Sequence, residues 1–174
     1  AEFGAPAFSP IVYVREAAPG LNTGESWLNA FSGPLGLRNA LALTALSPGA
    51  YEAIWAAAGT YKPSPALTQG GSRSVSFQLQ NNLAIYGGFA GGESTLAERN
   101  VPLNATILSG DLNGNDPNSI LDNTNSVVVA ANVSNTAVLA GVTVRAGYAN
   151  GGQFAAGIPA SPNASPVIRD CTIE

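Results

Sequence analysis

Short runs rich in β-branched and aromatic residues return along this chain, and their spacing constrains the fold more than any other feature. Equivalent positions lie about 20 to 30 residues apart. They are marked by Ile54, Ile85, Ile107, Val128, Val144 and Val167. Clusters of Gly, Asn, Ser and Pro, such as Gly87-Gly88, separate the runs. A repeat of this length is typical of a solenoid, in which each repeat stacks on its neighbour.

The corners between runs distinguish a parallel stack from a β-sandwich. A sandwich needs hairpins with two-residue turns and strands that alternate between buried and exposed positions. Several runs here are short and uniformly apolar, and neighbouring runs meet at a single Gly or Asn, as in Leu139-Ala140-Gly141-Val142. The pattern therefore predicts an all-β solenoid, a parallel β-helix.

A helical pattern over residues 32–46 precedes these runs. Ser32 is a candidate N-cap, Pro34 lies in the first turn, and Ser47-Pro48-Gly49 ends the segment. A helix here would cover the first strands of the stack, whose backbone groups are otherwise unpaired. We expect an N-terminal extension (1–10), a cap made of a strand and a short α-helix (11–50), and β-helix turns (51–174).

The last run, residues 167–173, has the pattern of a strand and is followed only by Glu174. We therefore expect a piece of a longer protein. An uncapped last turn exposes a strand edge and core side chains to other chains. This predicts self-association through Val167 and Ile173.

Composition excludes several classes of function. The chain has 174 residues, seven basic against eleven acidic side chains and a net charge of −4, which disfavours binding to nucleic acid or anionic membranes. No apolar run reaches the roughly 18–20 residues of a membrane span. The absence of His removes Ser-His-Asp triads, Cys-His dyads and the usual transition-metal sites. Cys171 has no second cysteine for an internal disulfide.

A set of segments in a fixed order carries a family resemblance. They are Gly24-Glu25-Ser26-Trp27, Ile54-Trp55-Ala56-Ala57-Ala58-Gly59, Ala84-Ile85-Tyr86-Gly87-Gly88-Phe89, Thr106-Ile107-Leu108-Ser109-Gly110-Asp111 and Pro166-Val167-Ile168-Arg169-Asp170-Cys171. Together they resemble the N-terminal part of large bacterial right-handed parallel β-helix surface proteins. They are also similar to the repeats of the chlamydial polymorphic outer-membrane proteins. The resemblance implies a secreted or cell-surface bacterial protein of adhesin type, and it supplies no catalytic motif.

One loop has the spacing of a calcium site. Counted from the first residue, oxygen-bearing side chains fall at positions 1, 3, 5, 9 and 12, the ligand positions of an EF-hand loop. They are Asp111, Asn113, Asn115, Ser119 and Asp122. Asp116 occupies position 6, where that loop has Gly, and the Asp at position 12 is shorter than the usual Glu. The alternative is a surface insertion in which Asn and Asp side chains form local turns.

Aromatic and charged side chains offer further candidates. Tyr86 and Phe89 flank Gly87-Gly88 and are the candidate rings for stacking on a sugar, although packing in the core or at a corner is the favoured interpretation. Glycoside hydrolysis needs two carboxyl groups about 5–10 Å apart, whereas the clustered acids here lie within one loop. Arg145 and Arg169 alternate with apolar neighbours, which favours outward-facing, solvated side chains.

These observations favour a non-enzymatic segment of a secreted or cell-surface protein, an adhesin or stalk. It would present a face to a glycan or to a protein of a host or cell surface. The alternative is the N-terminal part of a polysaccharide lyase or glycoside hydrolase whose catalytic turns lie beyond residue 174. No catalytic residue is assigned, and calcium is the one cofactor that the sequence suggests.

Overall fold

Three parallel sheets and one α-helix form the fold. The computed structural model describes residues 10–67, 71–149 and 157–174, so residues 1–9 of the expected extension lie outside the described residues. The six-stranded sheet has the order β11 (Val167–Arg169), β9 (Val138–Ala140), β6 (Ala84–Phe89), β3 (Ala53–Ala57), β1 (Ile11–Arg15) and β2 (Phe31–Ser32). The four-stranded sheet has the order β12 (Thr172–Ile173), β10 (Thr143–Arg145), β7 (Thr106–Ser109) and β4 (Gly59–Tyr61). The third sheet pairs β5 (Phe77–Gln78) with β8 (Val128–Val129).

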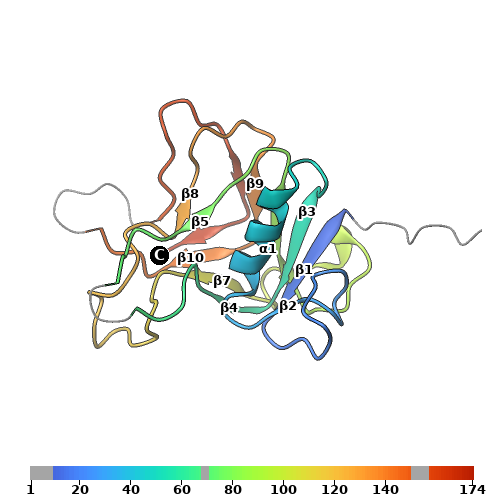
Figure 1. Cartoon of the computed structure of the whole chain (residues 1–174), viewed down its shortest axis with the longest axis horizontal. Helices are drawn as coiled ribbons and strands as arrows, with labels where there is room; N and C mark the ends of the chain where they lie inside the picture. The colour runs from blue at the N-terminus through green and yellow to red at the C-terminus, as the bar shows by residue number, and fades with distance from the viewer. Residues whose placement is uncertain (1–9, 68–70, 150–156) are drawn as a thin grey trace, which may run out of the picture.

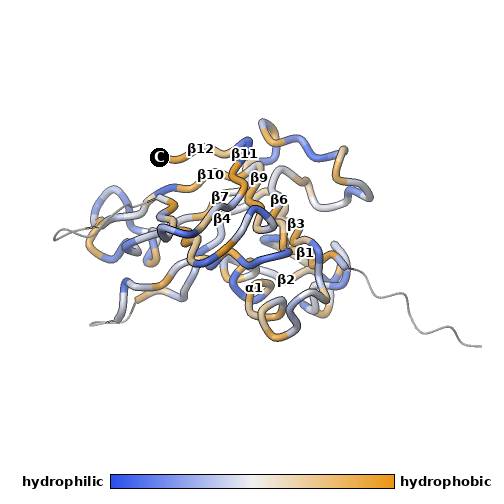
Figure 2. Tube along the Cα trace, turned by 90° about the horizontal axis from the view of Figure 1, so that it is seen from above, coloured by the Kyte–Doolittle hydropathy of each residue, from blue (hydrophilic) through white to orange (hydrophobic). Residues whose placement is uncertain are grey.

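From β3 onward the chain visits the three sheets in the same order. It runs through β3, β4 and β5, then through β6, β7 and β8, and later through β9 and β10 and through β11 and β12. A parallel bridge between Ala130 and Ala160 extends the third sheet. Among the described strands, neither of the two larger sheets closes on itself. Figure 2 shows the strands of the two larger sheets stacked in order, from α1 at one end to β11, β12 and the C-terminus at the other. The described residues therefore form a β-rich fold of parallel sheets, as the repeat of apolar runs predicts.

Register within the six-stranded sheet aligns aliphatic side chains. Val12 pairs with Ile54, which pairs in turn with Ile85, Leu139 and Ile168 along the sheet. The first four are at most 1% exposed, whereas Ile168, on the edge strand, is 36% exposed. Because each residue of the set lies beside its equivalent in the next strand, the core is continuous along the stack.

The four-stranded sheet repeats this arrangement. Tyr61, Leu108, Val144 and Ile173 occupy one register position, and only Ile173 of the four is exposed, at 57%. The Tyr61 hydroxyl donates a hydrogen bond to the Ala57 carbonyl at 2.9 Å. Burial, together with the nearby Glu16, raises the pKa of this phenol. The two rows of core side chains thus end on residues that are open to solvent, Ile168 in the six-stranded sheet and Ile173 in the four-stranded sheet.

The helix α1 (Gly36–Leu46) packs on the first strands of the stack (Figure 1). Leu37, Ala40 and Leu41 join the core cluster that contains the buried side chains of the two larger sheets. The expected N-cap at Ser32 is wrong. The helix begins after Leu35, with no side-chain cap, because Ser32 is extended and pairs with Arg15 in β1–β2.

Two other local expectations differ from the structure. Residues 167–173 form two strands, β11 and β12, because Asp170 turns the chain with φ +53° and the next strand joins a different sheet. Gly87-Gly88 was expected to separate runs, yet β6 continues through both glycines to Phe89. Parallel pairing on both sides of β6 therefore overrides the weak strand propensity of glycine.

We predict that Leu139→Ala lowers the free energy of unfolding by about 2–5 kcal/mol, because it opens a cavity in the aliphatic row between Ile85 and Ile168. Leu103→Ala is the matched control, since Leu103 is 80% exposed, and it should change stability by less than about 0.5 kcal/mol. Urea unfolding of both variants measures the difference. Equal effects of the two substitutions would contradict the continuous core.

Candidate functional site

The predicted calcium loop is folded around its own carboxylates. Asp111 accepts hydrogen bonds from the backbone N–H groups of Gly114, Asn115 and Asp116, at 2.6, 3.1 and 3.3 Å. Asp122 accepts one from the N–H of Asn113 at 3.1 Å. These are the local turns that Asp and Asn side chains form with nearby backbone.

The other oxygen-bearing side chains of the loop also have protein partners. The side-chain oxygen of Asn113 accepts the N–H of Leu67 at 2.8 Å. With its amide oriented to satisfy both atoms, Asn115 donates to the Ser119 carbonyl at 2.9 Å and to Asp122 at 3.1 Å. Within the described ranges, no group of three or more Asp, Glu, Cys or His side chains is placed to hold a metal ion. The calcium site stays a prediction.

The ends of this loop are held to the stack. The N–H of Thr124 donates to the Gly110 carbonyl, and the N–H of Gly110 donates to the Arg145 carbonyl, each at 2.9 Å. A cavity of about 430 Å³ lies beside the loop and is lined by Asp111, Asp116, Arg145 and Glu174 among others. The structure therefore brings Arg145, which the sequence placed outside any site, next to the loop acids.

A second cavity, of about 570 Å³, lies beside the C-terminal end of α1. Its polar lining is mostly uncharged amides, including Gln80, Asn81 and Asn132, with Tyr51 as the aromatic member. Two of these amides hold the fold together: Gln80 donates to the Leu41 carbonyl at 2.9 Å, and Asn81 accepts the N–H of Ser134 at 2.7 Å. Sequence reasoning missed this cavity because its residues come from distant segments.

The two predicted stacking rings have different surroundings. Phe89 is fully buried, and its ring stacks on Trp55 at a centroid distance of 4.7 Å and packs against Trp27 at 5.5 Å. Phe89 belongs to an aromatic cluster on the outer face of the six-stranded sheet, and its own ring has no surface open to solvent. Tyr86, on the same strand, is half-buried and lies at the border of this cluster.

Register explains what lies next to Tyr86. Tyr13, Trp55, Tyr86, Ala140 and Arg169 occupy one register position in the five strands from β1 to β11. Along the sheet, the side chain at this position is an aromatic ring in β1, β3 and β6, a methyl group in β9 and a guanidinium in β11. The small side chain of Ala140 therefore separates the Tyr86 ring from Arg169.

The side chain of Arg99, a loop residue, enters the space between the Tyr86 ring and Arg169. The segment before it contains the short helix η1 (Leu96–Glu98). The Glu98 carboxylate accepts the N–H groups of Thr95 and Ser94 at 2.9 and 2.7 Å, and these bonds hold the pKa of Glu98 below its ordinary value. A carboxylate that stays ionised keeps the turn, and with it the start of the Arg99 side chain, in place.

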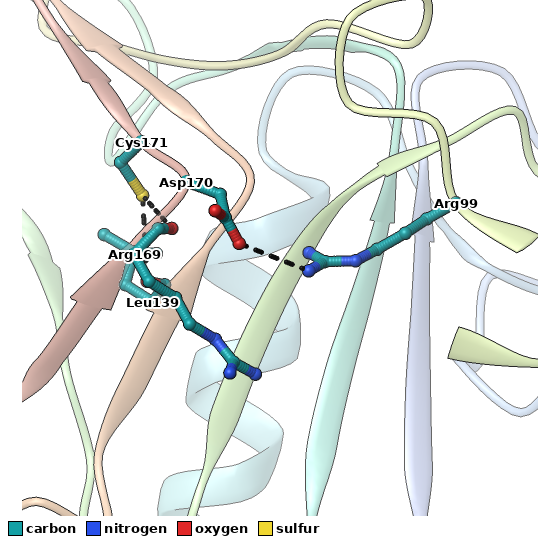
Figure 3. Close-up of polar contacts among 5 residues, drawn as sticks. All are labelled: Arg99, Leu139, Arg169, Asp170 and Cys171. Carbon is teal, nitrogen blue, oxygen red and sulfur yellow. Dashed lines mark hydrogen bonds and ion pairs between the residues drawn. The ribbon is translucent and has the colours of Figure 1, made fainter. Parts of the chain in front are cut away.

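The guanidinium of Arg99 lies over the outer face of the sheet (Figure 3). Its Cζ atom is 5.3 Å from the Tyr86 ring centroid, and the Cζ atom of Arg169 is 6.0 Å from the same centroid. Arg99 Nη2 is 3.7 Å from a carboxylate oxygen of Asp170. We call these residues, Tyr86, Arg99, Arg169 and Asp170, the arginine pair site.

Charge in the arginine pair site is unbalanced. Two guanidinium groups share one ring, and Asp170, whose side chain is 61% exposed, is the carboxylate placed against Arg99. Arg99 Nη1 is buried and has no hydrogen-bond partner. A buried donor without an acceptor costs about 1–3 kcal/mol. The site therefore holds net positive charge on a chain whose net charge is −4.

Two further sequence candidates lie at the C-terminal end of the stack. Val167 and Ile173 are 36% and 57% exposed, on strands β11 and β12, and each strand forms one edge of its sheet. Cys171, between them, is half-buried, and its sulfur lies 3.2 Å from the Arg169 carbonyl oxygen and 3.7 Å from that of Leu139 (Figure 3).

Comparison of the chain with family models, with curated proteins and with solved structures finds no match. In the part of the chain that the structure describes, no helix is both long and apolar enough to cross a membrane. The functional argument therefore depends on the geometry of the sites described above.

The spacing of the loop predicts that calcium raises the melting temperature, because a ligand that binds only the folded state stabilises it. Asp111→Ala should abolish that increase, while the exposed control Glu52→Ala, outside the loop, should retain it. Thermal melts in calcium and in chelator measure both. Identical melts in the two buffers would leave the loop a polar insertion.

Proposed function

We propose that the chain is a right-handed parallel β-helix from a secreted or cell-surface bacterial protein, and that it acts as a non-enzymatic scaffold of adhesin type. The order in which the chain visits its three parallel sheets supports the β-helix. The family resemblance of the segments around Trp27, Ile54, Tyr86 and Ile168 supports the right-handed form and the location outside the cytoplasm.

The observation that carries the proposed function is the alignment of outward side chains across successive strands. Residues at one register position of the six-stranded sheet form a continuous row from Tyr13 to Arg169. Trp55 and Ala140 are buried within this row, so the members that a ligand can reach beyond the aromatic cluster are the half-buried Tyr86 and the exposed Arg169. We propose that this outer face, at Tyr86 and beyond, contacts glycans.

We predict that the folded chain binds members of an immobilised glycan panel and does not cleave them. Tyr86→Ala should weaken binding, because it removes the ring that supports both guanidinium groups. Tyr51→Ala, a half-buried tyrosine beside the amide-lined cavity, is the matched control and should bind normally. Circular dichroism of both variants verifies that they fold.

Three results would change this proposal. Loss of binding in Tyr51→Ala alone would move the contact to the amide-lined cavity. Release of new reducing ends or unsaturated products would favour the polysaccharide-active enzyme. Failure to bind any glycan would remove the proposed glycan contact.

We also propose that the chain self-associates through β11 and β12. Their outer edges are unpaired by other described strands, and Val167, Ile168 and Ile173 are exposed beside them. Exposed strand edges with apolar side chains are templates for pairing with another chain.

Sedimentation velocity over a range of concentrations should detect this association. Val167→Lys should weaken it several-fold, because the substitution removes an apolar contact and places a charge at the strand edge that would pair. Leu103→Lys changes an exposed leucine away from these strands and should leave association unchanged. A monomer at every concentration would contradict the proposal.

A further inference from the structure

We propose that the arginine pair site binds an acidic sugar, a saccharide ring that carries a carboxylate, and this inference rests on the glycan contact proposed above. The sugar carboxylate would contact the guanidinium groups of Arg99 and Arg169. The sugar hydroxyls would donate to Asp170. No residue of the predicted calcium loop or of the two cavities takes part.

The backbone places the two guanidinium groups on one surface. Arg169 ends β11, in register with Ala140 of β9 and Tyr86 of β6. Ala140 is fully buried although it belongs to the outer row. A larger residue at this position would occupy the space between Arg169 and the Tyr86 ring.

Arg99 is held in place before any ligand arrives. Its side chain is only 16% exposed, and the next residue, Asn100, donates its N–H to the Gly88 carbonyl at 2.7 Å. Gly141 has φ +74°, and a β-carbon there would lie 2.8 Å from Arg99 Nη1. Glycine at position 141 therefore permits the Arg99 guanidinium to lie close to the backbone that follows β9. A guanidinium that is already ordered loses little conformational entropy when it binds a ligand.

The charges of the site favour a carboxylate. A guanidinium is planar and binds a carboxylate through two parallel N–H donors. The contact between Arg99 and Asp170, at 3.7 Å, is longer than the roughly 2.7–2.9 Å of a charge-assisted hydrogen bond. Arg99 Nη1 has no acceptor, so a carboxylate that binds this guanidinium displaces no hydrogen bond at that nitrogen.

Asp170 favours an acidic sugar over an acidic peptide. It lies beside the two arginines and is mostly exposed, so it repels a ligand that carries several carboxylates. The same carboxylate accepts hydrogen bonds from hydroxyl groups. One sugar ring offers both features, a single carboxylate and several hydroxyl donors.

Isothermal titration tests the inference with a tetrasaccharide that carries one glucuronate and with its neutral methyl ester. The acid should bind at least about tenfold more tightly than the ester, since a charge-assisted hydrogen bond is lost in the ester. Arg169→Gln should raise the Kd for the acid at least about tenfold. Arg145→Gln is the matched control, because it removes the same charge from another exposed arginine that ends a strand, β10, and its Kd should stay within about twofold of the unmodified chain.

The alternative outcomes each overturn a defined part of the proposal. Equal losses in the two arginine variants would mean diffuse electrostatic attraction and no site. Equal binding of acid and ester, or of glycan-panel members without a carboxylate, would leave the glycan contact intact and overturn the acidic-sugar site. Tighter binding of tetraglutamate than of the acid would make the ligand an acidic peptide. No binding of any saccharide would overturn the proposed function together with the site.

Discussion

Parallel pairing in register places one aliphatic side chain beside the next through five strands of the six-stranded sheet, from β1 to β11, and the other features depend on this alignment. Val12, Ile54, Ile85 and Leu139 form a buried row, and a shift of one strand by one residue would turn its member of the row to the outer face. The register that buries this row also fixes which residues face outward. The aromatic cluster and the arginine pair site are therefore consequences of how the core packs.

The outer row changes its chemistry along the stack, and each change has a structural counterpart. Where it carries Trp55, the loop residue Trp27 and Phe89 at the end of β6 cover the face with rings. Where it carries Ala140, the methyl group leaves space that the loop residue Arg99 enters. Small side chains at one register position thus allow a distant loop to add charge to a sheet whose own strands are mostly apolar.

The repeat of apolar runs predicted the parallel, β-rich fold because runs such as 53–56 and 142–144 show their strand character locally. The start of α1 could not be predicted from its capping residues, because pairing of Ser32 with Arg15 is a tertiary contact. Arg169 was expected to face outward and is exposed. Its nearness to Arg99 was beyond sequence reasoning, since the two residues meet only after β6, β9 and β11 pair in register. The burial of Phe89 also depends on a tertiary contact. Its glycine-rich neighbourhood suggested a surface corner, whereas pairing of β6 with β3 buries the ring.

The long loop after β7 leaves and rejoins the stack at nearly one point, where Thr124 is hydrogen-bonded to Gly110. Leu112 and Asn123, near the two ends of the segment, are buried, whereas residues 114–121 between them are mostly exposed, so we expect the stack to tolerate a different length or sequence in that middle part. The entropy of closing a flexible loop rises only slowly with its length. The corner between Gly110 and Thr124 is therefore a place where evolution, or an engineer, can exchange one surface module for another while the sheets keep their register.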